Sequence, residues 1–217
     1  MCSSDLVLLG PERKSHLLTK TEKKISAYHE AGHALTAAIL PQIDPVHKIS
    51  IVARGRAAGY VLKLPIEDRH LYSRTQFLSE LAVCLGGYAA EQLVFHELTT
   101  GAADDLQKAT SIARNLVTKY GMSEKIGPIT FGERDELVFL GKELGVGKGY
   151  SEEAANLIDK EVSRFMKDGL KQAKDILTKH RDALEVIAQR LIEKETIERK
   201  EFEKITKELG LQSKKAE

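Results

Sequence analysis

The 217-residue sequence is poor in the residue types that mark disulfide-stabilised or nucleic-acid-binding proteins. It has two cysteines, no tryptophan and 6% aromatic residues. Two cysteines cannot form a disulfide framework, which favours a reducing compartment. So few aromatic side chains argue against a surface on which bases or sugars stack. The 33 basic and 32 acidic side chains leave a formal charge of +1, so nucleic acid is not an expected partner.

Long apolar runs are also missing. No stretch of about eighteen apolar residues occurs, so we expect a soluble fragment that neither spans nor directly contacts a bilayer. Residues 1–10 lack the basic and apolar regions of a signal peptide. With 42% hydrophobic residues, the chain is long enough to bury a core without disulfides or a structural metal.

Helical periodicity dominates what is present, and the sequence predicts a mainly α fold with a small β-hairpin. The capping box Thr19-x-x-Glu22 opens a helix that must end before Pro41. Alternating and β-branched residues predict the two hairpin strands over 46–53 and 59–64. Further helices are predicted over 73–95, 103–120, from 151 onward, 182–192 and 197–209, the last with Thr196 as its N-cap.

A possible metal site lies inside the first predicted helix, where residues 29–33 read His-Glu-Ala-Gly-His. Side chains four residues apart lie on one face of a helix, so His29 and His33 converge on one point. Two imidazoles at this spacing are typical zinc ligands. Glu30 lies about 100° around the helix, beside the metal, where a carboxylate can accept a proton from water.

A catalytic zinc needs a third protein ligand and an open position for water. Asp105 shares the apolar face of the helix predicted over 103–120, and a buried carboxylate there needs a cation as partner. Its alternative role is in capping the start of that helix. Asp104 faces outward, where it favours the helix dipole. Glu91 lies in another largely apolar helix, either as a ligand or as an acid that orients an imidazole.

Several motifs together resemble the FtsH-type zinc metalloproteases, in which the protease is linked to an AAA ATPase and anchored in a membrane. They are GPERKS at 10–15, KKISAYHEAGHAL at 23–35, GGYAAE at 86–91 and TTGAADDL at 99–106. The resemblance implies one Zn²⁺ per chain with His29, His33 and Asp105 as ligands. It implies Glu30 as the general base, and Glu91 as an acid beside the ligands rather than on the metal.

The resemblance also implies that this chain is the isolated C-terminal protease domain of a membrane-anchored parent, working on the cytoplasmic side of a bacterial-type inner membrane. Unfolded proteins are the implied substrates, and the implied assembly is a homo-hexamer. No G-x-x-x-x-G-K-[ST] motif occurs, so no ATP site is expected in this fragment. We expect a connector over 1–18, a zinc-binding catalytic subdomain over 19–150, a C-terminal helical subdomain (a helical bundle) over 151–210 and a charged tail over 211–217.

The second predicted hairpin strand offers a way to bind substrate. If it forms a sheet edge near the metal, its residues Gly59, Tyr60, Val61 and Leu62 can pair with an extended polypeptide by strand addition. The alternative is an ordinary structural hairpin. A different class of function is also open, in which the C-terminal helices assemble a ring and the metal is structural.

Overall fold

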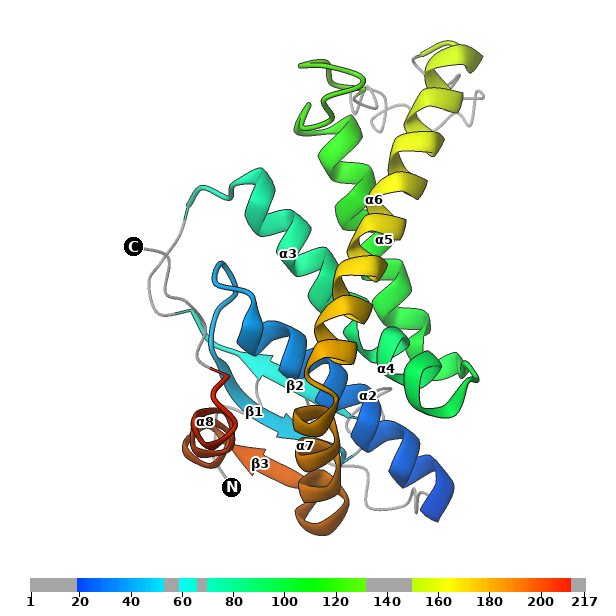
Figure 1. The fold of residues 1–217 in the computed structure, drawn as a ribbon. Coiled ribbons are helices and arrows are strands. Elements are labelled where there is room, and N and C mark those ends of the chain that lie inside the picture. The colour runs from blue at the N-terminus through cyan, green and yellow to red at the C-terminus, as the bar shows by residue number, and fades with distance from the viewer. Residues whose placement is uncertain (1–18, 53–58, 66–69, 132–149, 212–217) are drawn as a thin grey trace, which may run out of the picture.

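The computed structural model describes residues 19–52, 59–65, 70–131 and 150–211. Helices predominate and a small sheet lies beside them, so the predicted mainly α class is confirmed (Figure 1). In chain order the elements are α2 (Lys20–Ile39), β1 (Val46–Ser50), β2 (Tyr60–Lys63), α3 (Arg74–Cys84), α4 (Gly86–Phe95), a 3₁₀ turn (Thr100–Ala102), α5 (Ala103–Thr118), α6 (Glu152–Lys179), α7 (Arg181–Lys194), β3 (Thr196–Glu198) and α8 (Arg199–Glu208).

Helix α2 begins at the predicted capping box. The hydroxyl of Thr19 accepts from the Glu22 amide at 3.2 Å, and the Glu22 carboxylate accepts from the Thr19 amide at 2.8 Å. The helix ends at Ile39, and Leu40 is already extended with ψ at 119°, as expected for a residue that precedes proline. Its middle, residues 27–37, is buried throughout. The histidine motif therefore lies in the best-anchored part of the helix.

The sheet has three antiparallel strands in the order β2-β1-β3. Pairing of Ile49 with Val61 confirms the hairpin strands, whereas the turn between them, residues 53–58, lies outside the described residues. The prediction for Thr196 was wrong. It lies in β3, where its hydroxyl is 2.9 Å from the Ser50 hydroxyl, and Glu198 is the N-cap of α8. Pairing with β1 gives this segment backbone partners that local sequence does not reveal.

The single helix predicted over 73–95 is two helices. The chain turns at Leu85, which has φ −88° and ψ 0°, and this redirects α4 toward α2. Helices α2 and α4 approach each other closely at Gly32 and Gly86. A Cβ on Gly32 would lie 2.5 Å from the Gly86 carbonyl oxygen. Only residues without side chains fit at this crossing.

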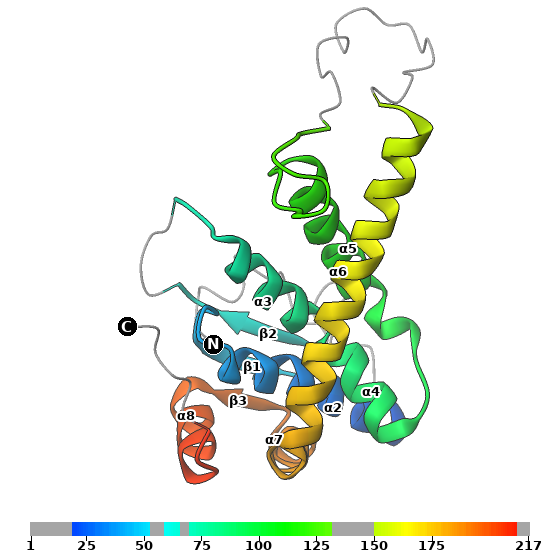
Figure 2. The same cartoon turned by 45° about the horizontal axis from the view of Figure 1, so that its top comes forward.

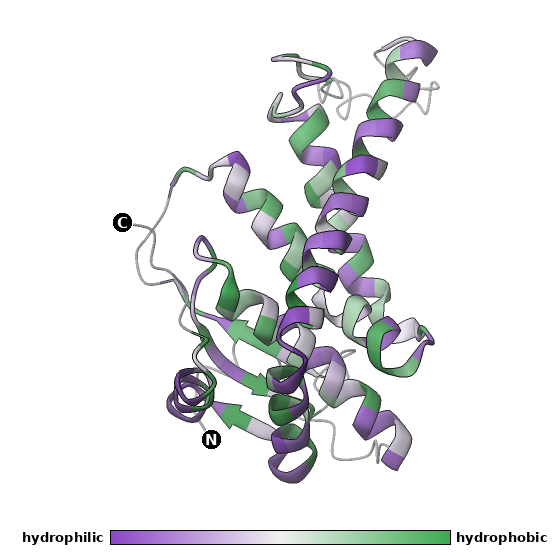
Figure 3. Cartoon of the chain, in the orientation of Figure 1, coloured by the Kyte–Doolittle hydropathy of each residue, from purple (hydrophilic) through white to green (hydrophobic). Residues whose placement is uncertain are grey.

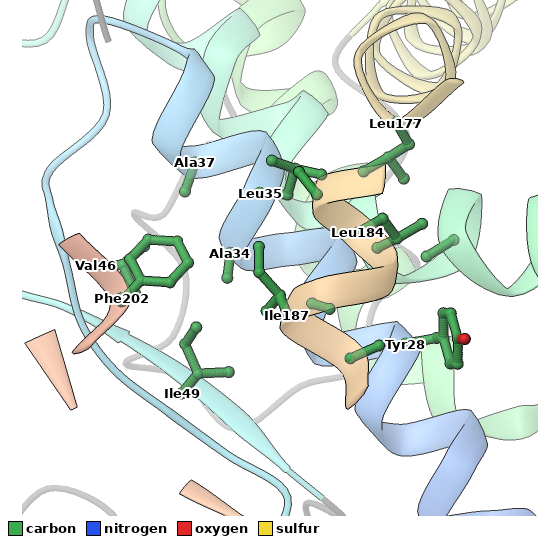
Figure 4. Packing of buried hydrophobic residues seen from close by; sticks show 14 of the residues in the cluster. Tyr28, Ala34, Leu35, Ala37, Val46, Ile49, Leu177, Leu184, Ile187 and Phe202 are labelled. Carbon is green, nitrogen blue, oxygen red and sulfur yellow. The ribbon is translucent and has the colours of Figure 1, made fainter. Parts of the chain in front are cut away.

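Two apolar clusters hold the elements together. One joins α2, α7, α8 and the sheet, and Figure 4 shows Leu35 near Leu184 of α7, with Ile49 and Phe202 on the side of α2 that faces the sheet. The other joins α3, α5 and α6 around the fully buried Phe165. Both views show the long helix α6 running from α7 to the far end of α5 (Figures 1 and 2). Hydrophobic and hydrophilic residues alternate in colour along the helices and strands, and α8 is largely hydrophilic (Figure 3).

The subdomain boundary proposed at residue 150 stays a prediction. The proposed connector over 1–18 lies outside the described residues, as does the tail apart from Leu211, which is buried in the first cluster. Among the described residues, no helix combines the length and the apolar character needed to cross a membrane.

Candidate metal centre

The two histidines of α2 face the same point, as their spacing predicts. Each is 7% exposed, and their Nε2 atoms lie 3.0 Å apart. The ring planes are inclined at 73°, so each imidazole presents the edge that carries Nε2. Helix α2 therefore supplies two nitrogen donors in a nearly buried position.

Helix α5 brings Asp105 to the same point from its first turn. The Oδ2 atom of Asp105 is 3.1 Å from His29 Nε2 and 3.3 Å from His33 Nε2. Asp104 is exposed and points away, which agrees with the helical positions of the two acids. Among the described residues, His29, His33 and Asp105 form a cluster whose ligand atoms all lie within 4.8 Å of one another.

The other nitrogen of each imidazole shows where the ring protons lie. His33 Nδ1 is 2.7 Å from the carbonyl oxygen of Val83, which can only accept, so Nδ1 must donate. His29 Nδ1 is 2.6 Å from Glu91 Oε1, and it likewise donates to the carboxylate. In the neutral rings, both Nε2 lone pairs then face Asp105 Oδ2 with no proton between them. Three such atoms this close need a positive charge between them, which either a proton on an imidazole or a metal ion can supply.

The three distances fit a zinc ion. Bonds of 2.0–2.2 Å in a tetrahedral site place the ligand atoms about 3.3 to 3.6 Å apart, and the distances here, 3.0, 3.1 and 3.3 Å, lie at the lower end of that range or up to 0.3 Å below it. Nitrogen and carboxylate donors match the preference of zinc. Imidazoles held through Nδ1 by a carboxylate or a backbone carbonyl are the usual support of such ligands.

The electrostatics of the cluster also favour a positive charge. Burial by itself lowers the pKa of His29, but hydrogen bonds to Asp105 and Glu91 outweigh it and raise this pKa to about 10. Burial opposes ionisation of Asp105, yet its hydrogen bonds to the two histidines bring the pKa of this carboxyl below its ordinary value. The two acids thus stay ionised around the imidazoles.

Glu91 lies on the far side of His29 from the cluster. It is 1% exposed. One oxygen accepts from His29, and the other accepts from the Thr99 amide at 2.8 Å. Burial raises the pKa of Glu91, but the bonds to His29 and Thr99 outweigh it, and the net shift is downward. With both oxygens engaged outside the triangle of donors, Glu91 can orient His29 and is not placed to share the metal.

Comparisons with known proteins agree with this geometry. Residues 16–205 match the model of peptidase family M41. The chain is 52% identical over 92% of its length to "ATP-dependent zinc metalloprotease FtsH 1" of Sphaerobacter thermophilus, covering 30% of that protein. It is 49% identical over 94% of its length to the FtsH of Thermotoga maritima, covering 34% of that protein.

The chain belongs to peptidase family M41. The resemblance seen in the motifs is thereby confirmed. This chain spans about a third of the length of the curated relatives described above. The M41 match includes all of α2 to α7 and therefore every residue of the cluster.

Glu30 of this M41 domain lies beside the cluster in a closed environment. It is 7% exposed, and its burial raises the pKa of the carboxyl above the ordinary value, although the nearby histidines oppose the shift. Gly59 packs directly against it, because a Cβ on Gly59 would lie 2.5 Å from Glu30 Oε1. The beginning of β2 is therefore next to Glu30.

The segment predicted to bind substrate borders the site. Within the described sheet, β2 pairs with β1 on one side only, so it is an edge strand. Tyr60, Val61 and Leu62 are half-buried, and at the end of the strand Lys63 forms an ion pair of 2.5 Å with Glu80 of α3. The free edge of β2 therefore begins next to Glu30 and ends next to α3.

Three supporting features of the site were missed in the sequence. Two are backbone groups, the Val83 carbonyl and the Thr99 amide, which bind His33 and Glu91. The third is Gly87, where a Cβ would lie 2.4 Å from His29 Nε2. Paired glycines such as Gly86 and Gly87 allow close approach of another part of the chain, but the sequence alone does not show that the neighbour is a ligand imidazole.

Proposed function

We propose that this chain is a zinc metalloendopeptidase in which His29, His33 and Asp105 hold one Zn²⁺. The observation that carries the proposal is the convergence of three lone-pair donors at distances of 3.0, 3.1 and 3.3 Å, with a buried carboxylate beside them. Membership of a peptidase family supports proteolysis, and the zinc in the relatives' names supports the choice of metal.

Zinc, when bound, supplies Lewis-acid chemistry, which polarises the scissile carbonyl and lowers the pKa of the attacking water toward 7. Glu30 accepts the proton of that water and passes it to the leaving amine. Burial suits Glu30 to this work, because a raised pKa makes the carboxylate a stronger base at neutral pH. Glu91 and the Val83 carbonyl keep the two imidazoles in the tautomer that leaves Nε2 free.

Substrate backbone binds to the free edge of β2 in this proposal. Strand addition uses the main chain, so it accepts many sequences. Gly59 packs against Glu30 at the start of this edge, which supports binding of an added strand along Gly59, Tyr60, Val61 and Leu62 of edge strand β2. An extended chain is needed for such pairing, and this supports unfolded proteins as substrates.

The assembly is proposed from the resemblance. The relatives are named ATP-dependent, and we infer that an attached AAA ATPase unfolds substrates and feeds them to this domain. The same resemblance supports a homo-hexamer, with residues 19–150 as the catalytic subdomain and 151–210 as the C-terminal helical subdomain. It also supports a membrane-anchored parent with this domain on the cytoplasmic side.

Substitution of the proposed base tests the function. Glu30→Gln keeps the shape of the side chain and changes none of the metal ligands. The variant should therefore bind zinc stoichiometrically while cleavage of casein, an unstructured substrate, falls by about 10²- to 10⁴-fold. Metal content and cleavage are measured on the same preparations. Turnover at the wild-type rate in Glu30→Gln, or no metal-dependent cleavage by the wild type, would show that the proposal is wrong.

A further inference from the structure

Gly59 touches the carboxylate that the proposed mechanism uses. An ideal Cβ at this position would lie 2.5 Å from Oε1 and 2.7 Å from Cγ of Glu30, and 2.8 Å from the carbonyl oxygen of Ser50. Contacts this short do not occur between non-bonded atoms in a packed interior. The side chain of Glu30 therefore occupies the volume that any other residue at position 59 would fill.

The neighbours of Gly59 determine which group must move when a methyl group is added. On one side is the backbone of β1, where Ser50 is held between β2 and β3. On the other side is Glu30, whose backbone lies in the buried middle of α2. Neither main chain can shift without disturbing the sheet or the histidines. The Glu30 side chain, with its rotatable bonds, is the group that can move, and its withdrawal leaves an added methyl group with only the 2.8 Å contact to the Ser50 carbonyl oxygen to relieve.

We propose that Gly59 is a positioning residue for Glu30, because the absence of a side chain at residue 59 provides the space in which the carboxylate reaches the attacking water. This inference rests on the proposed function. It adds a second role to a residue proposed above to offer its backbone to substrate. The two roles predict different kinetics, since loss of backbone pairing weakens substrate binding whereas displacement of the base slows the chemical step.

Gly87 provides the matched contrast, since it makes room for a metal ligand and not for the base. A Cβ there would lie 2.4 Å from Nε2 and 2.5 Å from Cε1 of His29. Gly87→Ala should therefore weaken zinc binding. Gly59→Ala should leave zinc binding unchanged, because Gly59 does not contact a proposed ligand among its nearest atoms.

The primary experiment compares zinc stoichiometry, kcat and KM for casein cleavage by the wild type and the Gly59→Ala variant. A misplacement of about 1 Å can reduce the rate by about 100-fold, so kcat should fall about 100-fold while zinc stays stoichiometric and KM changes less than about twofold. Gly169→Ala is the control, since its Cβ would meet the Leu81 side chain in the α6 interface. It should lower stability and preserve kcat.

A double-mutant cycle separates a steric effect on Glu30 from general damage. Shortening the acid by one methylene, as in Glu30→Asp, withdraws the carboxylate from Gly59. In the Glu30→Asp background, Gly59→Ala should then reduce kcat less than about threefold. The same cycle applies to thermal stability, which needs no activity. Gly59→Ala should lower the melting temperature more in the Glu30 background than in the Glu30→Asp background, and if it prevents folding, the double variant should restore it.

The outcomes are distinct. Unchanged kcat with raised KM in Gly59→Ala would overturn the positioning role and leave strand addition in place. Equal effects of Gly59→Ala on melting temperature in both backgrounds would also overturn it, as would failure of Glu30→Asp to restore folding. Absence of metal-dependent cleavage by the wild type would instead contradict the proposed function, and the stability cycle would still decide the contact between Gly59 and Glu30.

Discussion

Each imidazole of the cluster is held through the nitrogen that points away from the other imidazole. His29 donates to a carboxylate and His33 to a backbone carbonyl, which orients both rings with Nε2 toward Asp105. The carboxylate also makes His29 the more basic ligand. This division explains why two acids near one histidine have different roles. Asp105 lies next to His29 Nε2, on the side of the proposed metal, whereas Glu91 accepts a hydrogen bond from His29 Nδ1 on the opposite side of the ring.

The first prediction separates these two acids. Asp105→Ala removes one of three donors and should abolish stoichiometric zinc binding, whereas Glu91→Gln keeps the donors and should weaken zinc affinity by about 10- to 100-fold. Titration against a fluorescent chelator measures both affinities. Asp104→Ala is the matched control, because this exposed neighbour is outside the cluster, and it should bind zinc normally. The reverse order of effects would mean that the ligand and the orienting acid are exchanged.

The sequence predicted the site residues whose side chains are spaced along one face of a helix. The i, i+4 histidines and the inward position of Asp105 both follow from the 3.6-residue period, and the structure brings these three residues together. The supports of the site could not be predicted in the same way. A carbonyl at Val83 and an absent Cβ at Gly59 have no side-chain signature, and their importance depends on tertiary approach.

Among the elements, α6 holds the segment after α5 through a buried acid. Glu161 is 2% exposed, and it accepts from both Arg164 Nε and Nη2 and from the Ser123 hydroxyl at 2.7 Å. Lys125 lies 3.5 Å away. Hydrogen bonds from Arg164 and Ser123 lower the pKa of Glu161. They outweigh burial, which raises it, and the pKa falls to about 2. This ionised carboxylate ties residues 123–125 to the helix.

That shift gives a pH dependence with a defined sign. A carboxyl whose pKa is lowered on folding stabilises the fold fully above its unfolded pKa of about 4.5, and this contribution is lost as the pH falls toward about 2. Glu161→Gln removes the titration. Urea unfolding should therefore show the wild type as more stable above pH 4.5, and the difference should shrink steadily below it. A difference that stays constant from pH 6 to pH 3 would contradict the account.

Strand β2 carries a prediction about substrate. In an antiparallel strand, consecutive amides point alternately toward the neighbouring strand and away from it. Of the variants Val61→Pro and Leu62→Pro, one removes an amide that faces β1 and should lower stability. The other removes an amide from the free edge and should raise KM several-fold, with zinc content unchanged. Wild-type KM in the variant that keeps its stability would argue for a purely structural hairpin.

The elements were predictable to the extent that their signals are local. The capping box at Thr19 starts its helix as expected, and the helix predicted from residue 151 onward begins after a cap at Ser151; each cap is a side-chain bond to a nearby amide. The glycine pair after Leu85 weakens a helix locally, but it did not show that the chain turns there, because the turn depends on packing of α4 against α2. Strand β3 is three residues long and exists through pairing with β1. Both features are tertiary.

Helix α2 connects the sheet with the helices that surround it. It packs against α7 and the sheet on one side and against α4 at the glycine crossing. Next to the motif, the Tyr28 hydroxyl donates to Glu185 of α7 at 2.5 Å. The proposed metal ligands lie on α2 and α5, and the groups that hold the two imidazoles, the Val83 carbonyl and the Glu91 carboxylate, lie on α3 and α4. A site assembled from four elements is rigid only in the complete fold.

The coordination of the metal decides between the two classes of function considered for this chain. A structural zinc in a ring-forming module would have four protein ligands, whereas a catalytic zinc has three and keeps one position for solvent. Within the described residues the cluster contains three. The catalytic reading therefore predicts a fourth position that no side chain fills.

Crystallography of the zinc-loaded chain, with anomalous scattering recorded at the zinc edge, is the most direct test of this central claim. We expect one peak about 2.0 to 2.2 Å from Nε2 of His29, Nε2 of His33 and a carboxylate oxygen of Asp105, with a water molecule as the fourth ligand. A fourth protein ligand on the metal, or a peak bound elsewhere with these three side chains empty, would contradict it.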